Sequence, residues 1–232
     1  LSPLLANILL HQLDRELERR GHRFARYADD LLVLVKSPRA GERVKRSLTR
    51  YLGHTLKLTV NEAKSQVAPV SECAFLSFTF RGTKLRWTEA VLADFKHQVR
   101  KLTGRSWGVS MDYRLHQLGQ YVRGWMGYFG VSQYYRPIPE LDDWIRRRLR
   151  MCYWKQWRLC RTKIRHLRAL GVNLKMAIQH AVSSKSYWHM ARTPALQIAM
   201  SNAWLKAQGL VSVRDLWLKA QGYAKCGHRR AP

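Results

Sequence analysis

The chain has 232 residues, of which 46% are hydrophobic, so it can form a true core as one large domain or two small ones. Its 42 Lys and Arg residues against 15 Asp and Glu give a net charge of +27, which favours nucleic acid as a partner over an acidic membrane. No signal peptide and no run approaching a membrane span is visible, and the four cysteines form no CxxC pair, so we expect a cytoplasmic protein without a zinc ribbon or finger. The isolated pair Cys226 and His228 predicts no metal site either.

Residues 1 to about 82 alternate between helix and strand patterns. A first helix is expected between Ser2–Pro3 and Gly21, and a second between Ser37–Pro38 and Gly53. The leucine stripe of the first helix is expected to pack on a sheet. Strands are expected at 24–26, 31–35, 56–60, 75–80 and 85–87. The run at 31–35 follows neither a helical nor an alternating period, so we expect it to be buried on both faces. Helices with an antiparallel sheet predict an α+β half-domain.

Two adjacent carboxylates, Asp29 and Asp30, lie between the first two strand-like runs. This order predicts a β-hairpin with acidic side chains at its tip. Placing two carboxylates beside a buried strand is costly unless a cation neutralises them, and Mg²⁺ is commonly held by one or two carboxylates together with substrate phosphates. Such a donor set is typical of two-metal phosphoryl transfer. An isolated Asp-Asp pair is more often a solvated turn, so the neighbouring residues must decide between the two interpretations.

From about Thr88 the pattern becomes helical. Long helices are expected across 91–102, 115–129 and 141–157, with shorter ones around 167–178, broken by Gly171, and around 202–205 and 215–218. Trp and Tyr residues among the cations suit base stacking and cation–π contacts. An arginine-dense helix face suits a phosphate backbone, although it can also be only a solvated face. The predicted nucleic-acid-binding residues are Lys101, Arg105, Arg123, Arg146, Arg147, Arg148, Arg150, Lys155 and Arg158.

Four segments of the first part resemble, in family order, motifs of group II intron-encoded reverse transcriptases. Leu1–Ile8 is similar to their SPLLANI segment and Tyr27–Asp30 to the YADD form of their YxDD motif. Leu58–Ser65 is similar to their LxLNxxKT segment, and Phe75–Phe78 to their FLGF segment. Ser77 stands where the last motif usually has Gly, and we expect this change to be mild because a small residue is kept.

The helical part resembles the maturase-specific domain of the same family, also called domain X or thumb. Arg123–Phe129 is similar to its RGWxxYF segment, and Leu141–Arg150 to its LDxWIRRRLR segment. We interpret the pair Asp142–Asp143 as structural, because acids favour the start of a helix. The resemblance implies a partial right-hand polymerase palm at 1–82, an all-helical thumb at 83–161 and a basic helical region at 162–232. We expect no HNH endonuclease, because the His and Cys pairs that it needs are missing.

By this resemblance the protein is an RNA-directed DNA polymerase, a nucleotidyltransferase that uses Mg²⁺, dNTPs and a primer and template to copy intron RNA into cDNA. The resemblance also implies a maturase that binds group II intron RNA and assists splicing. Asp29 and Asp30 then correspond to catalytic metal ligands. Tyr27 and Ala28 correspond to positions beside the primer end and the incoming nucleotide, and Lys64 to a lysine that faces phosphate.

In the family, the third carboxylate, the fingers and the PQG segment all precede the SPLLANI segment, inside which this sequence begins. We therefore expect the C-terminal portion of a longer polymerase, which binds RNA but polymerises poorly by itself. Two alternatives remain: a non-enzymatic splicing factor that binds RNA through the thumb, and the remnant of a mobile element. A general basic protein, such as a ribosomal one, would not explain the order of the motifs.

Overall fold

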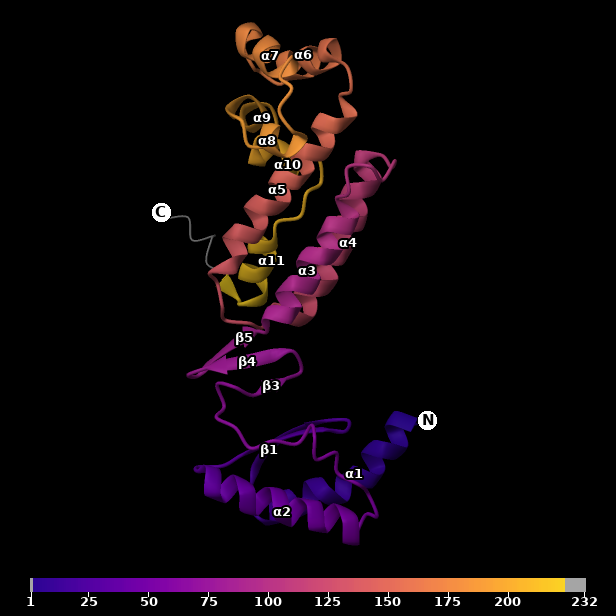
Figure 1. The fold of residues 1–232 in the computed structure, drawn as a ribbon, viewed down its shortest axis with the longest axis vertical. Coiled ribbons are helices and arrows are strands. Elements are labelled where there is room, and N and C mark those ends of the chain that lie inside the picture. The colour runs from indigo at the N-terminus through magenta and orange to yellow at the C-terminus, as the bar shows by residue number, and fades with distance from the viewer. Residues whose placement is uncertain (1, 224–232) are drawn as a thin grey trace, which may run out of the picture. The chain divides into compact units, whose positions relative to one another are not determined.

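The computed structural model describes residues 2–223, which form two compact units divided between Thr83 and Lys84. Cys226 and His228 lie outside the described residues. Unit 1 combines helices with small antiparallel sheets, whereas unit 2 is helical apart from one short strand at its start (Figure 1). This architecture confirms the predicted α+β class with an all-helical second part.

Unit 1 begins with helix α1 (Ser2–Arg19), strands β1 (Arg23–Tyr27) and β2 (Asp30–Leu34), and helix α2 (Pro38–His54). The two strands form an antiparallel hairpin in which Arg23 pairs with Leu34 and Tyr27 with Asp30. Side chains from both helices and the hairpin share one core, as predicted for the first helix. This core contains Leu13, Leu17, Leu48 and Leu56, with the partly buried Phe24, Leu31 and Val33 packed against it.

Two strand predictions in unit 1 are wrong in detail. Strand β2 is not buried on both faces, because within the described residues it pairs only with β1, and Leu34 remains 47% exposed. Residues 57–61 form no strand, although Leu56 is buried and Leu58 half-buried as the alternation predicts. The backbone of Lys57 has φ +57, and the N–H of Leu58 donates to the carbonyl of Leu52 at 2.9 Å. The segment is therefore held against the end of α2 instead of a neighbouring strand.

The single strand predicted at 75–80 is a tight hairpin. Strand β3 (Ala74–Phe75) pairs with β4 (Phe78–Arg81), and the turn between them is formed by Leu76 and Ser77. These turn residues have φ +49 and +70, a left-handed conformation that glycine adopts without strain and other residues do not. Ser77 is therefore more costly than the sequence suggested, because a small side chain does not relieve a positive φ.

Replacing Ser77 by Gly is expected to raise the free energy of unfolding by about 0.5–1 kcal/mol, since relief of the left-handed strain exceeds the greater chain entropy of glycine. Urea unfolding followed by circular dichroism measures the change. Ser71→Gly is the matched control, because Ser71 is an exposed turn residue without a positive φ, so glycine there brings only the entropy loss. A stability loss in both variants would show that Ser77 is not strained.

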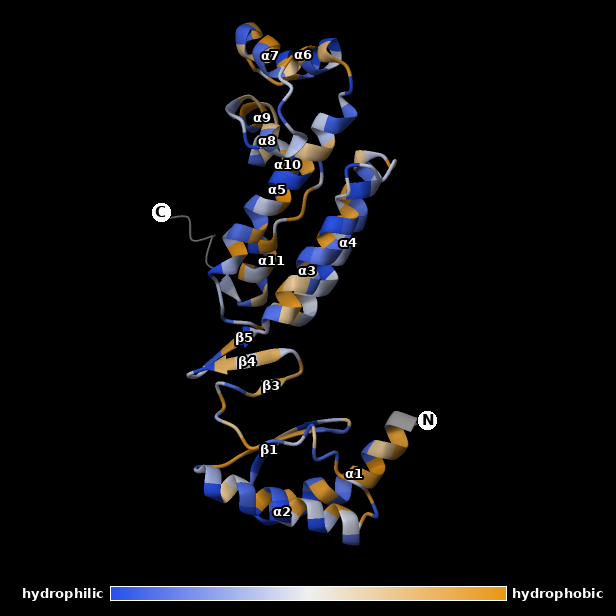
Figure 2. Ribbon diagram, in the orientation of Figure 1, coloured by the Kyte–Doolittle hydropathy of each residue, from blue (hydrophilic) through white to orange (hydrophobic). Residues whose placement is uncertain are grey.

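Unit 2 is built on three long helices with buried apolar side chains; the first two pack on each other, and the second and third both pack on the last helix of the unit. Phe95, Leu118, Val122, Ile145 and Leu149 are at most 1% exposed and form its centre. Apolar and polar residues are interspersed along these helices (Figure 2). The helix predicted at 141–157 begins earlier, at Pro137, because proline is well tolerated in the first turn of a helix. The elements are β5 (Lys84–Trp87), α3 (Glu89–Leu102), α4 (Met111–Phe129), α5 (Pro137–Gln156), α6 (Cys160–Ala169), α7 (Leu174–Ala181), α8 (Tyr187–Met190), α9 (Pro194–Ala199), α10 (Asn202–Ala207) and α11 (Val213–Ala220).

Helices α6 and α7 are separated at Gly171, which has φ +88, and this agrees with the predicted break. Helices α8 and α11 both pack against α5. Through residues 2–223, no helix has the length and apolar character that crossing a membrane requires.

Candidate functional site

The tip of the β1–β2 hairpin carries the two predicted catalytic aspartates. Tyr27 and Asp30 pair across the strand ends, so Ala28 and Asp29 form a two-residue connection, and Ala28 has φ +53. Tyr27 is 64% exposed, and both aspartates are exposed. Within residues 2–223, neither aspartate takes part in an ion pair or a side-chain hydrogen bond. Both carboxylates are therefore open to a cation.

Arg26 fastens this turn to α1. Its Nη1 donates to the carbonyl oxygen of Ala28 and to the amide oxygen of Asn7, each at 2.8 Å. Its Nε and Nη2 donate to the two carboxylate oxygens of Asp14, at 2.7 and 2.6 Å, in a bidentate pair. The hydrogen bond to Asp14 raises the pKa of Arg26. One guanidinium thus joins the SPLLANI-like segment, the middle of α1 and the turn that carries Asp29.

The hairpin tip fits part of a Mg²⁺ site. Asp29 and Asp30 offer hard oxygen ligands on adjacent residues, and Mg²⁺ is commonly held by one or two carboxylates plus waters and phosphates. Among the described residues, no three His, Cys, Asp or Glu side chains come together as a metal-binding group. Lys64 is exposed in a turn at 62–64, and within residues 2–223 no hydrogen bond or ion pair links it to the two aspartates.

The predicted arginine row on α5 is largely engaged within unit 2. Arg150 is 8% exposed and donates to the carbonyl oxygen of Met200 at 2.9 Å and to Asn202 at 3.1 Å. Arg148 donates to the hydroxyl and carbonyl oxygens of Thr103. Burial lowers the pKa of both guanidinium groups, as expected where a cation loses water. These two arginines fasten distant segments to α5 and do not present a free guanidinium to RNA.

Asp142 is buried and caps a different helix from its own. At 4% exposure, its carboxylate accepts from the hydroxyl of Ser212 and the N–H of Val213, each at 2.7 Å, and from the N–H of Arg214 at 3.2 Å. It also pairs with Arg146 at 3.3 Å. These contacts agree with the structural role predicted for the pair Asp142–Asp143. However, the helix start that Asp142 stabilises is that of α11 and not that of its own helix.

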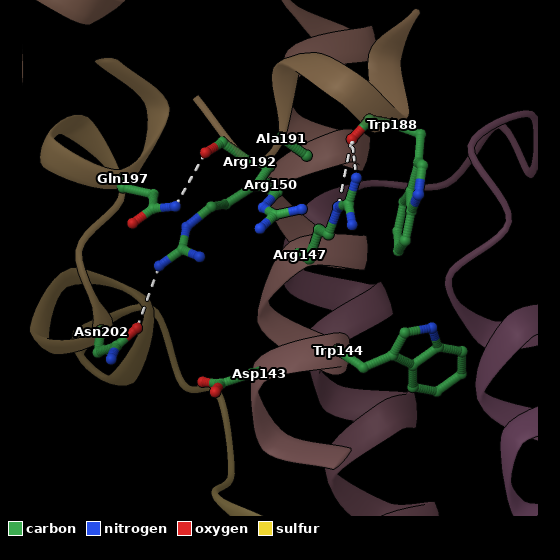
Figure 3. Close-up of a pocket in the computed structure, with 9 residues that line it drawn as sticks. All are labelled: Asp143, Trp144, Arg147, Arg150, Trp188, Ala191, Arg192, Gln197 and Asn202. Atoms are coloured by element: carbon green, nitrogen blue, oxygen red, sulfur yellow. Dashed lines mark hydrogen bonds between the residues drawn. The ribbon is translucent and has the colours of Figure 1, made fainter. Parts of the chain in front are cut away.

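A pocket of about 510 Å³ lies beside α5 (Figure 3). The indoles of Trp144 and Trp188 lie on one side of it, and Gln197 and Asn202 on the other. Arg147 donates to the carbonyl oxygen of Trp188 at 3.0 Å, and its guanidinium lies 3.8 Å from the centre of that indole. The pocket is lined by Asp143, Trp144, Arg147, Arg150, Trp188, Ala191, Arg192, Gln197 and Asn202.

The charge of this pocket is mainly positive. Burial lowers the pKa of Arg147, and the nearby charge of Arg192 adds to that effect. Arg192 is exposed, and among residues 2–223 its guanidinium has no carboxylate partner. Asp143 is the one acid in the lining, and Arg146 neutralises it at 2.8 Å. Guanidinium groups beside half-buried indoles are suited to the phosphates and bases of a nucleic acid.

Comparison with known families gives two separate matches. Residues 1–80 match the reverse transcriptase (RNA-dependent DNA polymerase) family, and residues 92–171 match the group II intron, maturase-specific domain. The chain therefore joins a reverse transcriptase domain to a maturase-specific domain. A search of curated proteins found no match. The two matches confirm the resemblance that the motifs indicated, in the predicted order.

The reverse transcriptase match contains the whole hairpin and its Arg26 contacts, whereas the maturase-specific match contains α5 but ends before α8. The pocket is thus completed by residues beyond the matched range, including Trp188 and Arg192.

The remaining predicted nucleic-acid-binding residues of unit 2 are exposed. Arg105 and Lys155 lie 5.5 and 5.2 Å from the ring of Tyr187. Lys101, Arg123 and Arg158 are exposed, with no ion pair within residues 2–223.

Sequence reasoning missed Arg26, Asp14 and Arg192. For the first two, a signal existed: Arg26 is two residues from Phe24 and so lies on the same, inward face of the strand, where a cation requires a partner, and the preceding helix carries Asp14. Arg192 had no such signal, because it lies in the turn between α8 and α9, where no periodicity shows which side chains face α5.

Proposed function

We propose that the chain is part of a group II intron reverse transcriptase and maturase, which binds intron RNA and supplies two aspartates of an RNA-directed DNA polymerase site. The observation that carries this proposal is the hairpin tip, where Asp29 and Asp30 are exposed, form no ion pair with any of residues 2–223, and lie at a turn that Arg26 holds. The maturase-specific domain that follows in the sequence, and the cationic and aromatic pocket beside α5, support RNA as the partner.

In the proposed reaction, a primer 3′-hydroxyl attacks the α-phosphate of a dNTP in line, and pyrophosphate leaves. Bound Mg²⁺ supplies Lewis-acid stabilisation of the charge on the phosphate oxygens. Asp29 and Asp30 would hold the metal, and the exposed Tyr27 and the backbone of Ala28 would lie beside the primer end and the nucleotide. Arg26 keeps the turn in place through the Ala28 carbonyl. Lys64 would contact phosphate.

Two carboxylates form only part of a two-metal site, so we propose that this chain alone binds RNA but extends a primer poorly. In a primer-extension assay with Mg²⁺ and dNTPs, the purified chain is expected to give no product, while it retards intron RNA in a gel shift. Extension that Asp29→Ala abolishes would contradict the first expectation.

RNA binding is expected to depend on the exposed cations of the maturase-specific domain. Arg105→Gln combined with Lys155→Gln should weaken intron RNA binding about tenfold, since two phosphate contacts are lost, and should reduce its salt dependence. Asp29→Ala, which changes the catalytic hairpin alone, is the control and should leave binding unchanged. An affinity that does not vary with salt would count against phosphate contacts altogether.

A non-enzymatic splicing factor is the second candidate, favoured by the absence of a third metal-ligating side chain near the hairpin within residues 2–223. Splicing assays separate the two functions. If the chain joined to the rest of a polymerase palm makes no cDNA, and Asp29→Ala leaves splicing unchanged, the polymerase assignment fails and the splicing factor stands.

A further inference from the structure

Helix α2 carries a straight row of arginines that the proposed function does not use. Arg39, Arg43, Arg46 and Arg50 are spaced by four, three and four residues, so they lie on one face of the helix. All four side chains are exposed. At 1.5 Å per residue the row is about 16 Å long. We call these four residues the α2 arginine ridge.

In the described part of the chain, no carboxylate pairs with an arginine of the ridge. The one side-chain hydrogen bond that these arginines form there is from Arg46 to the backbone carbonyl of Glu42 at 3.4 Å. Glu42 and Glu62 line a shallow pocket with Arg46 and Arg50, yet neither carboxylate lies within pairing distance. Like charges three and four residues apart destabilise a helix. An anionic partner along this face would remove that repulsion.

The opposite face of α2 is fully used by the fold. Leu48 belongs to the core of unit 1, and Val44 and Leu52 pack against it with the hairpin and α1. The ridge therefore faces away from the β1–β2 hairpin. A basic amphipathic helix binds a membrane by inserting its apolar side, and here that side is not free. Among polyanions, this leaves nucleic acid as the class that best fits a linear row of guanidinium groups, which bind phosphates in bidentate geometry.

We propose that the α2 arginine ridge is a second RNA-binding surface, which contacts the phosphate backbone of structured RNA independently of the maturase-specific domain. This inference rests on the proposed function only in taking RNA as the partner. Because the ridge contains only guanidinium groups and no aromatic side chain, its contacts position the RNA and carry no sequence preference. The reverse transcriptase domain would then bind RNA on the side of α2 remote from the catalytic hairpin.

The test compares two variants of the 232-residue chain with equal loss of charge. Arg43→Gln with Arg46→Gln removes the middle of the ridge. Arg15→Gln with Arg23→Gln removes two exposed arginines of the same unit that lie on α1 and β1. Fluorescence anisotropy with a labelled RNA hairpin of mixed sequence, titrated at several NaCl concentrations, gives the affinity and its salt dependence. Circular dichroism verifies that both variants fold.

The ridge variant is expected to bind about tenfold more weakly, and its slope of log affinity against log salt should fall by about 1.5–2, one step for each lost phosphate contact. The control should lose less than about threefold, because it alters only the long-range field. Equal losses in both variants, or none in the ridge variant, would overturn the inference. So would competition by polyglutamate as effective as that by RNA. If the unmodified chain binds no RNA hairpin, the proposed function itself fails.

Discussion

Asp142→Ala is expected to lower the free energy of unfolding by about 3–4 kcal/mol, because it removes a buried acceptor from several donors at once. The N–H groups of Val213 and Arg214 and the hydroxyl of Ser212 would lose their shared acceptor, and no water can easily replace it at the buried Val213 N–H. The N-terminus of α11 would also lose the negative charge that its dipole favours. Thermal and urea unfolding measure the loss.

The neighbouring residue provides a control with the same chemical change. Asp143 has a side chain that is 77% exposed, and its one ion pair among residues 2–223 is with Arg146, at 2.8 Å. Asp143→Ala should therefore change stability by no more than about 0.5 kcal/mol. Hydrogen exchange adds a local measurement, since α11 should lose protection in the Asp142 variant before α3 and α4 do. Similar losses in both variants would show that the α11 cap contributes little.

Those contacts also show where sequence reasoning reached its limit in unit 2. The helix positions could be predicted from apolar periodicity and from the Pro and Gly residues that begin or end helices. These signals are local, because each depends on residues close together in the sequence. The roles of the arginines could not be predicted in this way, because their acceptors lie far along the chain: Arg148 binds Thr103, and Arg150 binds Met200. Arginine density alone cannot distinguish a guanidinium that binds its own backbone from one that binds phosphate.

In unit 1 the limit was backbone conformation. The hairpin tip at Asp29 and Asp30 was predictable because two strand-like runs flank a short acidic connection. The turn at Leu76 and Ser77 was missed because neither residue type signals a positive φ, although both adopt one. At 57–61, alternation gave the burial pattern, but a strand also needs a neighbour to accept its hydrogen bonds, and periodicity carries no information on that neighbour.

The contacts of Arg26 lead to a second large effect, on the hairpin itself. Arg26→Ala is expected to lower the free energy of unfolding by about 2–3 kcal/mol, because it breaks a partly buried bidentate pair and leaves the Asp14 carboxylate without its cation. Arg23→Ala is the control on the same strand. Arg23 is exposed and forms no ion pair in the described chain, so its loss should cost no more than about 0.5 kcal/mol.

A double-mutant cycle with Asp14→Ala separates the pair from the other contacts of Arg26. If the bidentate pair carries the effect, the double variant should be more stable than the sum of the single losses predicts, by about 1–2 kcal/mol. Additive losses would instead assign the effect to the bonds with Asn7 and the Ala28 carbonyl. Those two bonds bear on function, because Ala28 is held at φ +53 next to Asp29. Breaking them should raise hydrogen exchange in the turn without unfolding α1, so the cycle would show whether α1 positions the turn that carries Asp29 or only supports the fold beneath it.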